Sequence, residues 1–116
     1  MMILYHNPQC SKSRQALQWL QENGFNPHIR LYLREPLSAN EIQEIAQKLG
    51  IPSLRDMMRT QDAAYQEQNL AQASEETLQA ALLANAKLLE RPILLTQHKA
   101  AIGRPLDNII ALVQAA

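Results

Sequence analysis

Short apolar runs and one amphipathic segment alternate over the first third of the chain. Residues 3–6 form an apolar run that predicts a buried strand followed by a turn. From Ser11 the spacing becomes helical up to Gly24, and residues 27–33 alternate as a half-buried strand does, with every second residue up to Leu33 facing the core. A strand, a helix and a strand in this order predict a βαβ unit with parallel pairing.

Helical spacing dominates the middle of the chain. A capping-box motif at Ser38 begins an amphipathic helix that Gly50 closes, and a second capped helix begins at Ser74. Between them, residues 53–60 predict a short helix. The polar residues 61–73 show only weak helical spacing, and we expect them to form a surface connection.

Two strands and a helix are predicted for the last part of the chain. Residues 91–96 predict a buried strand, which Pro92 can open but could not occupy in its middle. A hairpin turn leads from it to a second strand at residues 100–103. Pro105 then suits the first turn of a final helix.

The order of these elements predicts one α/β domain. The order β-α-β, a helical insertion at about residues 38–90, and β-β-α is that of a thioredoxin-like domain with a mixed four-stranded sheet. A chain of 116 residues, 47% of them hydrophobic, is large enough for a single core. We therefore expect residues 1–116 to form a single thioredoxin-like domain.

Charge and the absence of leader patterns exclude several function classes. Lys and Arg number 11, as do Asp and Glu, so the formal net charge is zero. A whole-surface attraction to nucleic acid or to an anionic membrane is therefore not indicated, and any anion site must be local. The N-terminal apolar run is too short for a signal peptide or a spanning helix, so we expect a cytoplasmic protein.

Cys10 is the single cysteine of the chain and the first candidate for chemistry. One thiol cannot form an internal disulfide, so a redox reaction would need a thiol from another molecule. Cys10 stands where the first strand gives way to a helix, whose first N–H groups favour a thiolate. Lys12 and Arg14 add charge nearby, the Ser13 hydroxyl could donate to the sulfur, and His6 could act as a cation or as a neutral partner. The competing interpretation is a small buried apolar side chain.

Four motifs occur in a fixed order along the chain. They are HNPQCSKSR at residues 6–14, MMR ending at Arg59, ERPIL around Arg91 and IGRP around Arg104. Together they resemble the glutaredoxin-coupled arsenate reductase family, and the resemblance extends over residues 3–113. It implies a thioredoxin-like fold with a helical insertion, which agrees with the element order above.

The resemblance also implies a reaction. Cys10 would attack arsenate and form a covalent thiol-arsenate intermediate, while Arg59, Arg91 and Arg104 would bind the oxyanion. Glutathione would be the co-substrate, and glutaredoxin would resolve the mixed disulfide. Guanidinium groups suit this role because they hold tetrahedral oxyanions bidentately and stay charged while doing so.

Further residues receive expected roles from the same resemblance. His6 and Ser13 match positions linked to thiolate stabilisation, and Pro92 matches a cis-proline beside the active cysteine. Lys12 stands where the family tends to have a small or uncharged residue, and it could strengthen oxyanion binding or indicate a different substrate. No cofactor or metal is expected to be bound. Arg30, Arg34 and Arg55 are expected to be ordinary surface residues, and no role is assigned to His28 or His98.

Two alternative functions stay open. A glutathione-dependent thiol reductase of another substrate, such as a protein mixed disulfide, would use the same cysteine without needing all three arginines. A non-enzymatic relative of Spx-type regulators would bind RNA polymerase and would need no sulfur. The C-x-x-C switch of those regulators is impossible here, because Ser13 stands at the second cysteine position.

Overall fold

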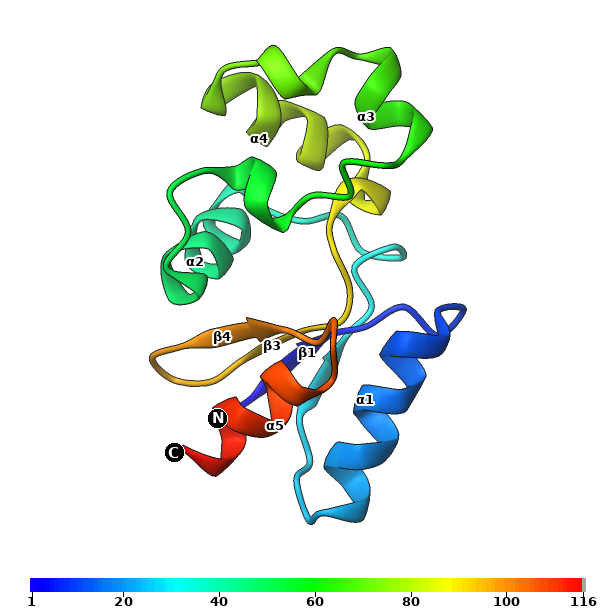
Figure 1. Cartoon of the computed structure of the whole chain (residues 1–116), viewed down its shortest axis with the longest axis vertical. Helices are drawn as coiled ribbons and strands as arrows, with labels where there is room; N and C mark the ends of the chain where they lie inside the picture. The colour runs from blue at the N-terminus through cyan, green and yellow to red at the C-terminus, as the bar shows by residue number, and fades with distance from the viewer. Residues whose placement is uncertain (116) are drawn as a thin grey trace. The chain divides into compact units, whose positions relative to one another are not determined.

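The computed structural model describes residues 1–115, which form two compact units. The sheet unit contains residues 1–34 and the described residues from Arg91 onward, and the helical unit contains residues 35–90. In Figure 1 the sheet unit carries the blue and the orange-to-red parts of the chain, and the helical unit carries the green part. Within residues 1–115, no helix has the length and apolar character needed to cross a membrane.

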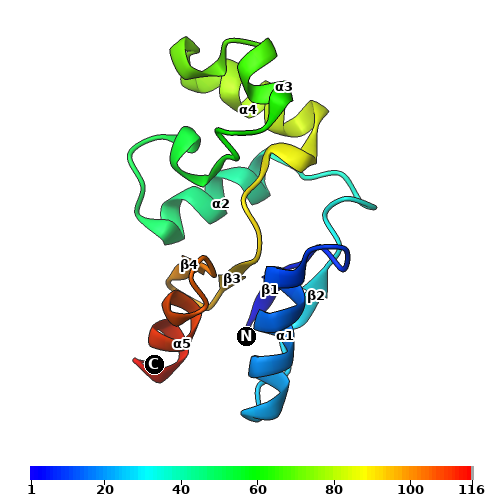
Figure 2. The ribbon, with the colours of Figure 1, turned by 45° about the vertical axis from the view of Figure 1, so that its right-hand side comes forward.

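Four short strands form the sheet of the sheet unit (Figures 1 and 2). β1 (Ile3–Tyr5) is parallel to β2 (His28–Arg30) and antiparallel to β3 (Ile93–Leu95), and β4 (Ala100–Ile102) is antiparallel to β3. The order β2-β1-β3-β4 confirms the predicted mixed four-stranded sheet. Parallel pairing of β1 and β2 requires a crossover, which α1 (Ser11–Glu22) supplies.

Apolar side chains from both helices of the sheet unit pack on one face of the sheet. Leu4 of β1 and Leu94 of β3 are register partners, and both are fully buried. Side chains of α1 and of α5 (Asp107–Gln114) cover them, because apolar residues recur at helical spacing in each helix. The buried cluster consists of Leu4, Ala16, Leu20, Leu94, Ile109 and Val113.

The second strand is shorter than the sequence predicts. It ends at Arg30 and not at Leu33, because the N–H of Tyr32 donates to the Arg30 carbonyl oxygen over 3.0 Å. The N–H of Arg34 donates to the Leu31 carbonyl oxygen over the same 3.0 Å and completes a turn. Tyr32 is therefore buried and Leu33 is 45% exposed, which is the reverse of the predicted alternation.

In the sheet unit, the end of α1 agrees with the prediction from the sequence, and the start of α5 does not. α1 ends at Glu22, and Gly24, with φ 84°, continues the predicted turn. α5 begins at Asp107, so Pro105 lies before the helix and not in its first turn, contrary to the prediction. The Pro105 carbonyl oxygen accepts from the N–H of Asn108 over 3.1 Å, which closes a tight turn ahead of the α-helical hydrogen bonds.

The helical unit alternates α-helices with short 3₁₀ helices. The predicted capping box is present: the Ser38 hydroxyl accepts from the Glu41 N–H (3.1 Å), and the Glu41 carboxylate accepts from the Ser38 N–H (2.9 Å). Gly50 ends this first helix with φ 70°. The elements are α2 (Ala39–Leu49), η1 (Leu54–Met57), α3 (Ala63–Glu67), η2 (Leu70–Gln72), α4 (Glu75–Ala84) and η3 (Ala86–Leu88).

Residues 61–73 are not the surface connection that the sequence predicts. They include α3 and η2, whose Tyr65 and Leu70 are only 4% and 1% exposed. Arg55, expected to be an ordinary surface residue, holds this segment, since its Nη2 donates to the carbonyl oxygens of Leu70 (3.1 Å) and Ala73 (2.7 Å). Single apolar anchors within a polar segment carry no periodicity, so the pattern did not reveal them.

Candidate active site

Cys10 lies at the N-cap of α1, after the loop that follows β1. Its backbone is extended (φ −99°, ψ 123°), and its N–H donates to the Asn7 carbonyl oxygen over 3.0 Å. Its own carbonyl oxygen accepts from the Arg14 N–H over 3.0 Å. The thiol is partly exposed and forms no disulfide. It stands at the end of the helix where backbone N–H groups lack intrahelical acceptors.

Side chains of the first helical turn hold the loop in front of the cysteine. The Asn7 N–H donates to Oγ of Ser13 (3.2 Å), and the Asn7 side-chain oxygen accepts from the Gln9 N–H (2.9 Å). Nη1 of Arg14 donates to the Pro8 carbonyl oxygen over 2.8 Å. Ser13 is fully buried, so its hydroxyl fixes the path of the loop backbone.

The pKa of the Cys10 thiol lies below its ordinary value. Burial is the largest single influence and acts to raise it, but the backbone N–H groups of Ser13 and Lys12, with the hydrogen bond and charge of the Arg91 side chain, outweigh burial. The sulfur accepts no short cap hydrogen bond, so the amides act through the partial positive charge of the helix start. The side chain of Lys12 is itself exposed. A lowered pKa gives more thiolate, the nucleophilic form, at neutral pH.

Two arginines of the sheet unit lie beside the sulfur. Nη1 of Arg104 is 4.0 Å from Sγ of Cys10, and it donates to the Arg91 carbonyl oxygen over 3.3 Å. At 4.0 Å the contact places a positive charge beside the sulfur without a strong hydrogen bond. The Arg91 side chain acts on the thiolate directly, so two guanidinium groups face the nucleophile. The Arg104–Pro105 peptide bond is cis.

Strand pairing brings these groups to one end of the sheet. Because β3 is antiparallel to both of its neighbours, its start lies beside the ends of β1 and β4. The Arg91–Pro92 peptide bond is cis, and the Gly103 N–H donates to the Pro92 carbonyl oxygen over 2.8 Å. A Cβ on Gly103 would meet Cδ1 of Ile109 at 2.6 Å and Cγ of Pro92 at 2.9 Å, so the close approach requires glycine.

His6 is buried directly after β1. It is 5% exposed, and within residues 1–115 its Nδ1 has no hydrogen-bond partner. Burial lowers the pKa of His6, and the positive charge of Arg14 lowers it further. Of the two roles that the sequence left open for this residue, the lowered pKa favours the neutral partner over the cation.

Arg59 belongs to the helical unit, where both its backbone and its side chain are held. Its N–H donates to the Leu88 carbonyl oxygen over 2.8 Å, directly after the isolated β-bridge of Met58. Its Nη1 lies 3.5 Å from Oδ2 of Asp62 and donates to the Lys87 carbonyl oxygen, also over 3.5 Å. The part of Arg59 in oxyanion binding stays a prediction.

Sequence reasoning missed two polar residues that contact the candidate site residues. Asn7 organises the loop before Cys10, and the Asn-Pro pair at its position is a turn signal in which the side chain bonds its own backbone two residues on. Asp62 pairs with Arg59, and the available signal was its position three residues after Arg59 and directly before the start of α3.

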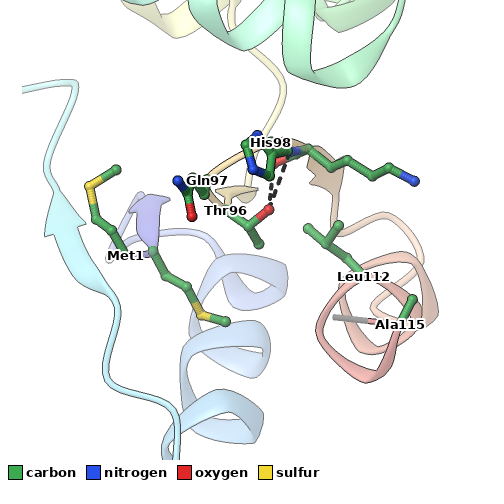
Figure 3. A pocket seen from close by; sticks show the side chains of 8 residues that line it. Met1, Thr96, Gln97, His98, Leu112 and Ala115 are labelled. Atoms are coloured by element: carbon green, nitrogen blue, oxygen red, sulfur yellow. Dashed lines mark hydrogen bonds between the residues drawn. The ribbon is translucent and has the colours of Figure 1, made fainter.

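A further cavity of the sheet unit contains none of the candidate site residues (Figure 3). Its volume is about 410 Å³, and its lining comes from Met1 and Met2 before β1, from the turn between β3 and β4, and from the end of α5. His98, for which the sequence indicates no role, lines it, and the hairpin beside it is closed by hydrogen bonds between Thr96 and Lys99. No group of three or more His, Cys, Asp or Glu side chains that could hold a metal ion occurs among residues 1–115.

The fold and the position of the thiol define the class of protein. A β2-β1-β3-β4 mixed sheet with a crossover helix after β1 is a thioredoxin-like fold, here with one cysteine at the start of its first helix. Residues 5–112 match the sequence model of the ArsC family. The chain therefore belongs to the ArsC family.

Relatives of similar length that are named arsenate reductase support this assignment. The arsenate reductase of Haemophilus influenzae is 45% identical over 114 residues, which cover 97% of this chain and 98% of the relative. That of Neisseria meningitidis serogroup A is 44% identical over 112 residues, with 95% and 96% covered. Among solved structures, the arsenate reductase from Vibrio cholerae matches with a TM-score of 0.91 at 38% identity and 95% coverage of each chain.

Proposed function

We propose that the protein is an arsenate reductase that takes its electrons from glutathione and glutaredoxin. The observation that carries the proposal is the Cys10 thiol, whose pKa is lowered and whose sulfur lies 4.0 Å from Nη1 of Arg104 with Arg91 acting on it as well. Two guanidinium groups offset the repulsion between a thiolate and an oxyanion. Relatives named arsenate reductase, at 45% and 44% identity, support arsenate as the substrate.

In the first step the Cys10 thiolate attacks the arsenic atom. A sulfur–arsenic bond forms, one arsenic–oxygen bond breaks, and that oxygen leaves with two protons as water. Arg91 and Arg104 hold the remaining oxygens and stabilise the charge that develops on them. We assign the third guanidinium to Arg59 and a supporting positive charge to Lys12, whose side chain is exposed.

Reduction of the arsenic needs a thiol from outside the chain, because Cys10 is its single cysteine. Glutathione adds its sulfur at the arsenic, and the two sulfurs then join as both sulfur–arsenic bonds break. Arsenic keeps an electron pair and leaves as arsenite. A glutaredoxin thiol takes the glutathione sulfur from the mixed disulfide and returns the Cys10 thiol. A second glutathione then restores glutaredoxin and leaves as glutathione disulfide. In the net reaction two thiols become one disulfide, As(V) becomes As(III), and one water is released.

Ser13 and His6 support the nucleophile in different ways in this scheme. Ser13 stabilises the thiolate through its backbone N–H and fixes the preceding loop through its hydroxyl. His6 is buried directly after β1, where burial and the positive charge of Arg14 favour its neutral form, so we assign it the part of a neutral partner.

Protection of Cys10 from alkylation tests the oxyanion site without any reductant. We expect arsenate to slow the reaction of iodoacetamide with the wild-type thiol. In Arg104→Ala about tenfold more arsenate should be needed, because one guanidinium contact is lost. Arg34→Ala, which removes an exposed arginine of the same unit, serves as the control and should behave as wild type. A wild-type rate that no concentration of arsenate alters would refute oxyanion binding at the thiol.

Omission of each thiol component tests the coupling. Arsenite should form at a steady rate only when arsenate, glutathione and glutaredoxin are all present. Rapid reduction of a glutathionylated protein together with no arsenite formation would instead favour the alternative thiol reductase. Steady turnover with glutathione alone would remove glutaredoxin from the proposal and leave the reductase in place.

A further inference from the structure

Asp62 uses both oxygens of its carboxylate within the helical unit. Oδ1 accepts from the Ala64 N–H over 2.9 Å and caps α3, while Oδ2 lies 3.5 Å from Nη1 of Arg59. The Asp62 N–H also donates to the Arg59 carbonyl oxygen over 3.0 Å, so a short turn fixes the two residues relative to each other. Their side chains are 20% and 29% exposed, which leaves the pair only partly screened by solvent.

The contacts of Arg59 are concentrated at one corner of its guanidinium group. Its hydrogen bond to the Lys87 carbonyl oxygen and its closest ion-pair contact with Asp62 both involve Nη1. A planar guanidinium group that is held at Nη1 presents its opposite edge, Nε and Nη2, in a fixed direction. Bidentate binding of an oxyanion needs such an edge, and a side chain fixed in advance loses less freedom when the ligand binds.

We propose that Asp62 is a positioning residue that orients the Arg59 guanidinium for oxyanion binding. The inference rests on the proposed function, which assigns Arg59 to the oxyanion. Asp62 itself touches no substrate. Its negative charge faces Nη1, which is already occupied, so the opposite edge of the guanidinium, Nε and Nη2, is the edge that we assign to the ligand.

Asp62→Asn separates this role from helix capping. Asparagine caps a helix start about as well as aspartate, so the Ala64 bond and the fold are retained while the charge on Arg59 is lost. We expect the KM for arsenate to rise about fivefold to tenfold with kcat changed less than about twofold, the pattern of lost ligand binding. Asp56→Asn removes an exposed carboxylate of the same unit and should leave both constants unchanged.

A double-mutant cycle shows whether Asp62 acts through Arg59. In an Arg59→Ala background, Asp62→Asn should have no further effect on the KM, because the group that it orients is absent. An equal effect in both backgrounds would overturn the proposal. So would a KM that stays unchanged or falls in the single variant, since a fall would mean that Asp62 competes with the oxyanion.

A readout that needs no turnover separates this inference from the proposed function. Rotation about the Cζ–Nη1 bond of Arg59, followed by ¹⁵N NMR of the guanidinium, should be slow in wild type and Asp56→Asn and faster in Asp62→Asn. If wild type forms no arsenite but shows this pattern, the arsenate assignment fails and the orientation of Arg59 stands. Equal rotation in all three proteins would refute the positioning role.

Discussion

Opposing influences meet at the sulfur of Cys10. Burial favours the neutral thiol, and the amides of the first helical turn favour the thiolate. Arg91 is the side chain that both hydrogen-bonds the sulfur and adds charge to it, so a single substitution there can change the balance. The backbone amides cannot be removed in this way, because every residue except proline supplies one.

Replacing Arg91 by glutamine should therefore raise the pKa of Cys10 toward its ordinary value. The thiolate fraction at neutral pH would fall, and alkylation by iodoacetamide would slow several-fold. In Arg91→Lys the pKa of Cys10 should lie between the values in wild type and in the glutamine variant, since lysine keeps the charge and lacks the planar guanidinium group. The pH dependence of the alkylation rate measures all three. Superimposable profiles would show that Arg91 does not act on the thiol.

His6 gives the folded protein a sensitivity to acid. Because burial and then Arg14 lower its pKa, the folded state resists a proton that the unfolded state takes up below about pH 6.5. Stability should thus fall as the pH drops from about 7 toward 5. In His6→Gln that loss should be smaller, as shown by urea unfolding at both ends of this range. An equal loss in the variant would exclude His6 as its source.

At the scale of elements, cap signals predicted boundaries better than alternation did. The Ser38 capping box begins α2, and Ser74 begins α4 by accepting from the Thr77 N–H. Both are local chemistry that a sequence carries in full. The prediction for residues 31–33 was wrong because the local hydrogen bonds of a turn after Arg30 end the strand. The prediction for residues 61–73 was wrong because Leu70 is buried and its carbonyl oxygen accepts from Arg55, which is distant in sequence.

Leu70 should be an anchor of the helical unit. It is 1% exposed, so Leu70→Ala leaves a cavity and should lower the free energy of unfolding by about 3 kcal/mol. Leu83 of α4 is 40% exposed, and Leu83→Ala should cost less than about 1 kcal/mol. Urea unfolding compares the two variants. Similar losses would mean that residues 61–73 form the surface connection after all.

At the scale of the whole molecule, the net charge is zero, but the charged residues are divided unevenly between the two units. The sheet unit has seven Lys and Arg against two Asp and Glu, and the helical unit has four against nine. Formal charges of +5 and −5 follow for the sheet unit and the helical unit. The thiol lies in the basic unit, where an anion site is favoured even though the chain is neutral.

This distribution predicts that salt affects Cys10 according to the charge of its reaction partner. An anionic aromatic disulfide should react with the thiolate several-fold more slowly as ionic strength rises from about 0.01 M to 0.5 M, because the Debye length shortens from about 30 Å to a few ångströms. A neutral disulfide reagent should show little change. Equal salt dependence for the two reagents would contradict a local positive field.

The sequence predicts the fold more completely than it predicts the side-chain contacts of the candidate site. Periodicity, caps and element order were enough for the mixed four-stranded sheet, because local patterns fix which segments pair. Cys10 could be placed at the start of a helix for the same reason. The partner of Ser13 could not be predicted, since a hydroxyl can bond several groups and only the folded path of the loop selects Asn7. The spacing of Arg59 and Asp62 was available in the sequence, but a spacing of three residues does not by itself select one ion pair.

The most direct test of the central claim is the initial rate of arsenite formation from arsenate with glutathione and glutaredoxin, in wild type and in Cys10→Ser. We expect wild type to produce arsenite steadily and Cys10→Ser to produce none above background, because the variant lacks the sulfur that attacks arsenate. No production by wild type while Cys10 still reacts with iodoacetamide would contradict arsenate as the substrate. Equal rates in the two proteins would contradict Cys10 as the nucleophile.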